Sequence, residues 1–275
     1  MLGSGQNVLS YSYYSATINT TTPLNTRYLE LLDTLLEDMV TLYPGWRMRL
    51  YHNVTQKDPS VWSYLCSMYC THPHLDLCNT RQLPAVGDLQ AHTPVGRLWR
   101  FQVLGDPTVR LFGVRDIDSY ILRRERDAVE DWERRKDKQF IVMRDSPQTN
   151  NGSRLLHGWP ISAGLWGGNN YVDYSLARRL RSRLYGRIGE EPQADQRVLK
   201  YRIWPLIRSS SAVYDSYHCR DHRKEFGFGR PWPTRRRGSL YVGSGPSKGE
   251  RIKELAQVTC PVICRPKEHK NWLFC

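Results

Sequence analysis

Apolar positions in the first third of the chain recur with two spacings, first every second residue and then every third or fourth. Residues 7–15, NVLSYSYYS, mix branched and aromatic side chains in the way that strands do. Residues 25–46 follow as a helix that Pro44-Gly45 ends. The apolar face of this helix carries Leu29, Leu32, Leu36 and Met39. Residues 47–53, RMRLYHN, alternate as a second strand. This order predicts two parallel strands joined by a right-handed crossover.

The same succession of elements continues to residue 145. The apolar run 108–118, TVRLFGVRDID, predicts a strand that ends on two acids, and 119–136 has the pattern of an amphipathic helix capped by Ser119. The other elements expected here are a helix at 60–70, a strand at 75–79, a polar loop at 80–95 and a strand at 139–145. Alternating units of this kind predict an α/β fold with an open, mostly parallel sheet flanked by helices.

From about residue 150 the pattern weakens. The elements expected are a glycine-rich loop at 158–170, a helix at 171–187, a helix at 194–207 that Pro205 ends, and a short strand at 211–219. The remaining tail holds too many Gly, Pro and Arg residues to be regular. We expect it to form an irregular C-terminal part that wraps over the sheet.

The composition of the 275 residues is globular, with 40% hydrophobic and 24% charged residues. No run of about twenty apolar residues occurs, so no membrane span is expected in this chain. The first twenty residues lack the basic start and apolar middle of a signal peptide. The protein is therefore either cytosolic or a fragment without its targeting segment.

The formal net charge of +13 predicts attraction to polyanions or to anionic small molecules such as nucleotides. The excess gathers at 176–187 and 230–238. A solvated basic surface is the alternative. Nucleic acid is an unfavoured partner, because no homeodomain, zinc-finger or RNA-recognition signature accompanies the charge.

Seven cysteines allow two interpretations. Zinc ligands could come from Cys66, Cys70, His72, His74 and Cys78, but only one half of a paired zinc-ligand pattern is present. Disulfides are the more economical interpretation, with one cysteine of the odd number left over. Sequons at Asn19, Asn53 and Asn151 agree with an oxidising lumen. The secretory pathway, as Golgi lumen or extracellular space, is therefore favoured over the cytoplasm.

The two acids that end the strand at 108–118 are Asp116 and Asp118. Ligands of open α/β sheets bind at the carboxyl ends of the strands. Residues two apart on a turn can direct both carboxylates to one point, where they repel each other unless a cation lies between them. Mg²⁺ and Mn²⁺ prefer such oxygen ligands and complete their shell with substrate phosphates. The alternative is a solvated turn with a capping acid.

The combined motifs resemble a known family. The strand ending in RDIDS, with GRLWRF before it and MRD, GLWGG, ADQ and IWP after it, is similar to GT-A-fold glycosyltransferases that carry a DXD motif. More narrowly, the chain resembles a group of uncharacterised glycosyltransferase-like proteins that share YPGW, WRF, RD-x-DS, MRD, GG and DS in this order. The resemblance covers roughly 7–245. It implies a single domain, 1–275, with a nucleotide-sugar and metal-binding half at 7–145, an acceptor-side half at 146–245 and an irregular tail at 246–275.

The resemblance further implies transfer of a sugar from a UDP- or GDP-linked donor to a hydroxyl of a glycan, protein or other acceptor, with Mn²⁺ or Mg²⁺ as cofactor. Asp118 would be the principal metal ligand, and Asp116 would bind the metal or the donor ribose and sugar. A further ligand comes from the C-terminal part in this family. Asp215 is favoured for it and His218 is the alternative.

Donor contacts are expected from three further groups of residues, each with a structural alternative. Arg97, Arg100 and Arg115 could neutralise the diphosphate or form ion pairs. Tyr11 and Tyr13 could stack on the base or lie in the core. Gly167 and Gly168, with Gly164, would let the backbone approach the sugar beside Trp166 as an acceptor platform, or they form an ordinary turn.

A base for an inverting reaction would be a carboxylate. Asp145, at the end of a predicted strand, is the first candidate and Asp195 the second, with Glu191 also available. A retaining enzyme would need no such base. Two other functions stay open at this point: a metal-dependent nuclease or phosphotransferase, and a non-catalytic carbohydrate- or nucleic-acid-binding protein.

Overall fold

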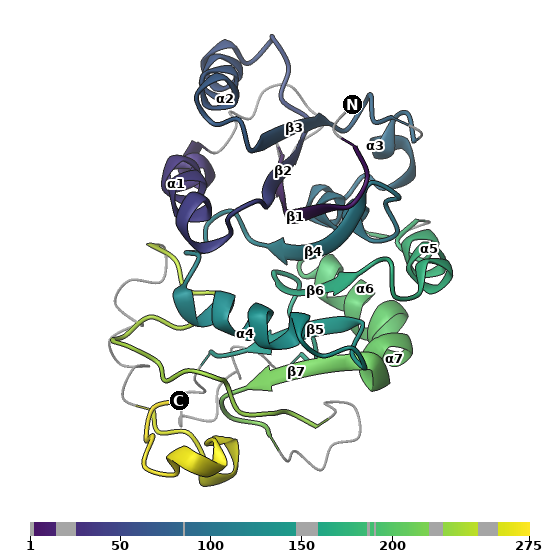
Figure 1. The fold of residues 1–275 in the computed structure, drawn as a ribbon. Helices are drawn as coiled ribbons and strands as arrows, with labels where there is room; N and C mark the ends of the chain where they lie inside the picture. Colours follow the sequence, from purple (N-terminus) through teal and green to yellow (C-terminus); the bar gives the residue numbers. More distant parts are fainter. Residues whose placement is uncertain are drawn as a thin grey trace.

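The computed structural model describes residues 3–14, 26–84, 86–146, 159–185, 188–189, 191–219, 228–246 and 258–275. A seven-stranded sheet in the order β3-β2-β1-β4-β6-β5-β7 runs through the molecule, with helices on both of its faces (Figure 1). The strands are β1 (Gln6–Tyr13), β2 (Arg47–His52), β3 (Leu75–Asn79), β4 (Val109–Arg115), β5 (Phe140–Arg144), β6 (Leu165–Asn169) and β7 (Ser211–Asp215). The predicted α/β fold with an open, mostly parallel sheet is confirmed.

The helices are α1 (Leu32–Leu42), α2 (Pro59–Thr71), α3 (Leu89–His92), α4 (Arg123–Glu133), α5 (Tyr174–Ser182), α6 (Ala194–Val198) and α7 (Trp204–Ile207). Two 3₁₀ helices matter for the site, η1 (Thr26–Leu29) and η2 (Gly96–Val103). Apolar residues of α1, α2 and α4 form one core against the sheet, and those of η2, α5, α6 and α7 form another on the opposite face. Each face of the sheet is therefore covered, as the apolar strands require.

The order in which successive strands are added to the sheet reverses at β1. β2 and β3 extend the sheet to one side of β1, whereas β4 pairs with the other side, and all three pairings are parallel. Such a topological switch point leaves a crevice outside the carboxyl ends of the two strands beside it. Here those strands are β1 and β4.

The prediction of a loop at 158–170 is wrong, because Leu165–Asn169 is strand β6. It runs antiparallel to both of its neighbours, β4 and β5. Its glycines serve close packing: a Cβ at Gly167 would overlap the carbonyl oxygen of Phe112, and one at Gly168 would press on the Phe112 and Phe140 rings. The sequence signal of a turn is therefore a signal of tight strand contact in this chain.

Two helix ends also differ from the prediction. Helix α4 begins at Arg123 after Leu122 in the N-cap position, so Ser119 does not cap it. Ser119 is buried and lies in the turn between β4 and α4. Pro205 does not end a helix either, because it occupies the first turn of α7, where its missing N–H costs no hydrogen bond.

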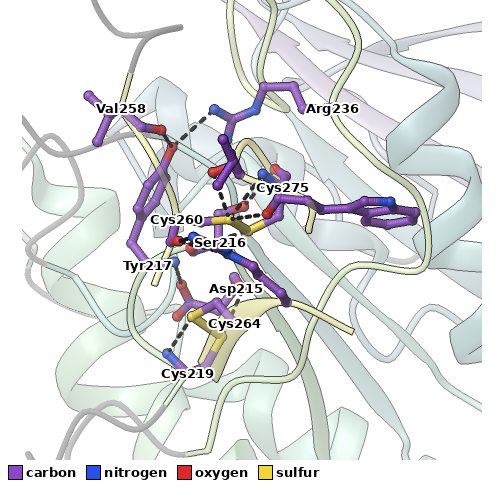
Figure 2. The surroundings of a disulfide bond; sticks show 12 residues. Asp215, Ser216, Tyr217, Cys219, Arg236, Val258, Cys260, Cys264 and Cys275 are labelled. Atoms are coloured by element: carbon purple, nitrogen blue, oxygen red, sulfur yellow. Dashed lines mark hydrogen bonds between the residues drawn. A yellow bond between two sulfur atoms is a disulfide. The ribbon is translucent and has the colours of Figure 1, made fainter. Parts of the chain in front are cut away.

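Two disulfides fix the C-terminal part. They join Cys219 to Cys264 and Cys260 to Cys275, beside the end of β7 (Figure 2). The predicted disulfides are thus confirmed, but three thiols are left over and not one, namely Cys66, Cys70 and Cys78. In the described ranges, these thiols and the nearby histidines form no group of three or more side chains that could hold a metal ion. The disulfides agree with an oxidising compartment.

Among the described residues, no helix combines the length and the apolar character needed to cross a membrane. The sequons at Asn19 and Asn151 lie outside these residues, and Asn53 directly follows β2.

The structure predicts one pH effect in the sheet. Burial lowers the pKa of His52 from 6.5 to about 4, against a smaller opposing effect of a backbone hydrogen bond at Val54. His52 therefore stays neutral in the folded state while the unfolded chain takes up a proton below pH 6.5. Its contribution to stability is present above pH 6.5 and is lost as the pH falls towards 4.

We expect this residue to remove about 2 kcal/mol from the free energy of unfolding between pH 7 and pH 5. Denaturant titrations at the two pH values, on the protein and on His52→Gln, measure it. The substituted protein should lose less stability over the same interval. An equal loss in both proteins would contradict the prediction.

Candidate functional site

The crevice at the switch point is formed where β1 and β4 end. Asp116 directly follows the last residue of β4, and Tyr14 directly follows the last residue of β1. The adjacent 3₁₀ helix η2 packs across β1, where the Ser10 hydroxyl donates a hydrogen bond to the carbonyl of Arg100 at 2.6 Å. These contacts place the side chains of η2 beside both strand ends.

Arg100 of η2 bridges two acids from distant parts of the chain. One of its Nη atoms pairs with Asp116 and the other with Oδ2 of Asp195 at 3.0 Å. The Arg100 and Asp195 side chains are only 7% and 9% exposed, whereas that of Asp116 is 41% exposed. The bridge therefore joins the end of β4 to α6 and leaves Asp116 as its accessible member.

Two glycines make room for this bridge. A Cβ at Gly164 would overlap the carboxylate of Asp116, and a Cβ at Gly96 would overlap the ring of Tyr14. Burial raises the pKa of Tyr14, and the charges of Arg97 and Arg100 beside it act in the opposite direction. Tyr14 and Gly96 were missed by the sequence analysis, although the position of Tyr14 at a strand end was a signal for the former.

Asp118 lies in a different surrounding from that of Asp116. It lines a surface cavity of about 90 Å³. The other residues of this cavity come from η1, from the turn that follows it and from the C-terminal part, and they are Arg27, Tyr28, Glu30, Leu31 and Pro246. Of the two acids, Asp116 therefore lies at the Arg100 bridge and Asp118 lines a separate cavity. Arg27 and Pro246 were not candidates in the sequence analysis.

Arg115 stabilises the segment between β4 and α4, which carries Asp116 and Asp118. Its completely buried side chain pairs with Glu125 at 3.3 Å and donates hydrogen bonds to the carbonyls of Tyr120 and Gly164 at 2.7 and 3.4 Å. This is the ion-pair alternative for Arg115, and Arg100 is ion-paired as well. Arg97 is partly exposed and lies beside Tyr14.

The tyrosines named as base-stacking candidates lie in the core. Tyr11 and Tyr13 are almost completely buried in the apolar cluster of α1 and α4. Burial raises the pKa of Tyr13 to about 12, and the charge of Asp58 adds to this effect. Trp166 is buried too, with its ring 5.5 Å from the centroids of Phe101 and Phe112. None of the three reaches the crevice surface.

Asp215, the favoured further metal ligand, caps the turn after β7. It is completely buried, its Oδ2 lies 2.7 Å from Nε of Arg144, and its Oδ1 accepts the backbone N–H groups of Tyr217 and His218 at 2.8 Å. His218 is brought to this turn by the same bonds. In the part of the chain that the structure describes, no three or more carboxylate, histidine or cysteine side chains are grouped to hold a metal ion.

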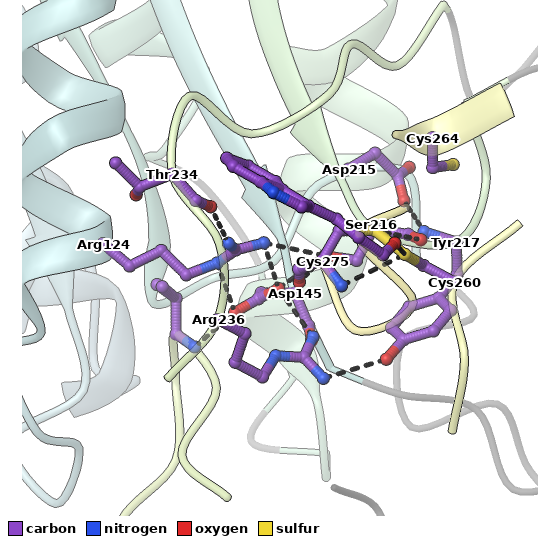
Figure 3. Close-up of polar contacts among 12 residues, drawn as sticks. Arg124, Asp145, Asp215, Ser216, Tyr217, Thr234, Arg236, Cys260, Cys264 and Cys275 are labelled. Carbon is purple, nitrogen blue, oxygen red and sulfur yellow. Dashed lines mark hydrogen bonds and ion pairs between the residues drawn. A yellow bond between two sulfur atoms is a disulfide. The ribbon is translucent and has the colours of Figure 1, made fainter. Parts of the chain in front are cut away.

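Asp145 directly follows the last residue of β5 and is completely buried in a polar cluster (Figure 3). Its carboxylate accepts hydrogen bonds from Arg124, Arg236 and Ser216 and from the backbone N–H of Val242. Burial by itself would raise the pKa of Asp145, but the charges of Arg124 and Arg236 and the hydrogen bonds outweigh it and lower the pKa. A base needs an accessible oxygen and a pKa near the working pH, and Asp145 offers neither.

The other two carboxylates considered as bases are also engaged. Asp195 has Oδ2 on Arg100, and its Oδ1 accepts the backbone N–H of Gln196 at 3.0 Å. Glu191 is exposed and forms an ion pair with Arg197. Asp195 therefore belongs to the crevice as a partner of Arg100, whereas Glu191 belongs to the surface.

Comparison with known proteins gives a similarity in chain trace only. No protein-family model matches the chain, and no curated protein matches it. Among solved structures, the chain is similar to a glycosyltransferase involved in the glycosylation of the major capsid of PBCV-1, with a TM-score of 0.42 and 11% sequence identity. The match covers 78% of this chain and 83% of that chain. A likeness at this level says nothing about the residues of the crevice.

Proposed function

We propose that the protein is a glycosyltransferase that binds a nucleoside-diphosphate sugar in the crevice at the ends of β1 and β4. The observation that carries the proposal is the placement of Asp116 and Asp118 on one turn at the switch point, the first half-exposed beside Arg100 and the second in a cavity. Ligands of open α/β sheets bind at such a point. Carboxylates there suit the hydroxyl groups of a ribose or sugar.

In this proposal Arg100 fixes the orientation of Asp116, and Asp195 fixes Arg100 from the other side. The accessible part of Asp116 accepts a hydrogen bond from a donor hydroxyl. Tyr14, which follows β1, and Arg97 of η2 flank the same crevice and would contact the nucleotide. Asp145 and Asp215 take no part in the chemistry, because arginines and backbone N–H groups already use their oxygens.

Asp118 fits a divalent cation in the donor complex. Mg²⁺ in phosphate sites is commonly held by one or two protein carboxylates and by the substrate phosphates, so Asp118 alone would suffice as the protein ligand. Asp215 does not fit this role, since Arg144 already balances its charge. When bound, Mn²⁺ or Mg²⁺ would offset the charge of the diphosphate and so stabilise it as a leaving group.

A panel of nucleoside diphosphates, with and without Mn²⁺, tests the proposal by thermal unfolding. At ten times its dissociation constant, a ligand of the folded state adds about 1.4 kcal/mol, which raises Tm by roughly 3 to 6 °C in a chain of this size. We expect a shift with UDP or GDP that needs the metal. Asp118→Ala should abolish it, and the exposed Asp137→Ala should retain it.

Two results would contradict the proposal. If no nucleotide shifts Tm, the proposed binding of a nucleoside-diphosphate donor is wrong. If the shifts with and without Mn²⁺ are equal, the proposed role of the cation is wrong. Metal-dependent cleavage of an oligonucleotide that Asp118→Ala abolishes would favour the nuclease alternative. Nucleotide binding without any hydrolysis or transfer of the donor sugar would favour the non-catalytic alternative.

A further inference from the structure

The segment 230–246, called the strap below, crosses the sheet edge at which the proposed site lies. It begins beside β7, where Arg230 donates to the carbonyl of Val213 at 2.7 Å and accepts from the N–H of Asp215 at 3.0 Å. Further along, a Cβ at Gly243 would press on Leu165, the first residue of β6. The strap therefore passes from β7 towards β4 across the strand ends between them.

Asp145 holds the strap at two points. Arg236 donates to its Oδ1 at 2.8 Å and to its backbone carbonyl at 2.7 Å (Figure 3). The N–H of Val242 donates to its Oδ2 at 2.9 Å. Arg124, at the start of α4, adds bonds to both carboxylate oxygens and to the carbonyl of Thr234. One buried carboxylate thus ties α4, β5 and the strap together.

The end of the strap lies directly on the turn that carries Asp118. The N–H of Tyr120 donates to the carbonyl of Ser244 at 2.9 Å, so strap and turn are hydrogen-bonded. Gly245 approaches so closely that a Cβ there would overlap the carbonyl oxygen of Asp118. The next residue, Pro246, lines the cavity together with Asp118.

We propose that Asp145 is a positioning residue that acts through the strap: it holds residues 243–246 as a wall of the Asp118 cavity and so fixes the turn that binds the donor. This inference rests on the proposed function for the identity of the ligand. The contacts themselves do not depend on it. Asp145 never touches the donor, and the strap transmits its effect to Asp118.

The conformation at Gly245 provides the sharpest test. We expect Gly245→Ala to push the strap from the Asp118 carbonyl and to break the bond between Tyr120 and Ser244. The matched control is Gly3→Ala, because a Cβ at Gly3 meets nothing within 4 Å. Amide hydrogen exchange should rise about tenfold at Tyr120 in Gly245→Ala, with amides of the distant β2–β3 pair unchanged. Unchanged protection of Tyr120 would overturn the proposal.

Asp145→Asn is a second variant. It removes the negative charge that offsets Arg124 and Arg236, and it replaces one of the two oxygen acceptors by an NH₂ group that would face either Arg236 or the N–H of Val242. We expect Tyr120 and Val242 to lose protection before the β2–β3 amides do, and the dissociation constant for UDP with Mn²⁺ to rise about tenfold. A uniform loss of protection at all amides would instead show a purely structural role and overturn the inference.

The two proposals fail separately. The protection of Tyr120 is measured without nucleotide, so it tests the strap even if no nucleoside diphosphate binds. If the unsubstituted protein binds no nucleotide but Gly245→Ala still exposes Tyr120, only the proposed function is wrong. If the nucleotide binds equally well to both Gly variants and Tyr120 stays protected, only the positioning role is wrong.

Discussion

Replacement of Arg100 by methionine is expected to lower the free energy of unfolding by about 3 to 5 kcal/mol and to abolish the proposed nucleotide binding. The guanidinium of Arg100 is shared by Asp116 and Asp195, and its side chain is almost fully buried. Its loss would leave the buried carboxylate of Asp195 without a counter-charge, and Asp116 would lose the partner that orients it. Both consequences meet at the crevice.

Three variants separate charge from geometry. Arg100→Lys keeps the positive charge, but an ammonium group cannot pair with two carboxylates in the fixed fork of a guanidinium, so partial stability with weak binding is expected. Arg110→Met is the matched control, because Arg110 lies exposed on β4. Chemical denaturation and UDP titration measure the two effects. Normal stability and binding in Arg100→Met would show that the bridge has no role.

The first half of the fold could be predicted because its apolar spacing is regular. The strands predicted at 47–53 and 75–79 are found at Arg47–His52 and Leu75–Asn79. The spacing of apolar residues gave no signal for β6, because its LWGGN sequence has neither β-branched residues nor an alternation of polar and apolar positions. Only the opposing Phe112 backbone and rings explain why glycine stands there, and such a contact between distant segments has no local signal.

The candidate site shows a different limit. Strands β4, β5 and β7 each lead into an aspartate, and an arginine from another segment partners each one: Arg100 for Asp116, Arg124 and Arg236 for Asp145, and Arg144 for Asp215. The sequence shows the same feature three times and cannot rank the copies. Burial separates them, since Asp116 is half-exposed and the other two are closed off. This is why acids chosen for similar reasons differ in role.

The arginine partners also explain part of the basic composition. Arg100, Arg115, Arg124, Arg144 and Arg236 are all buried and paired with acids or carbonyls at or near the sheet edge. These residues therefore add nothing to an exposed basic surface. Because five acids offset these five arginines, the net charge of +13 is carried by the other residues of the chain.

Reduction of the two disulfides is expected to produce the largest loss of stability in this protein. Loops of 45 and 15 residues are closed by Cys219–Cys264 and Cys260–Cys275, and the entropy of such loops in the unfolded chain corresponds to about 4 and about 3 kcal/mol. Even with incomplete additivity, Tm should fall by at least about 10 °C. The loss should begin at the carboxyl ends of β5 and β7, because Ser216 contacts both Cys275 and Asp145.

Thermal unfolding with and without a reductant measures this effect. The control is Cys66→Ser with Cys70→Ser, which removes two thiols that form no disulfide. Its melting temperatures with and without reductant should both be close to those of the unsubstituted protein. Cys260→Ser with Cys275→Ser should reproduce part of the loss without reductant, and exchange at Val242 should rise early because its N–H bonds to Asp145 beside the disulfides. An oxidised and a reduced protein that melt at the same temperature would show that the two disulfides contribute no stability to the sheet edge.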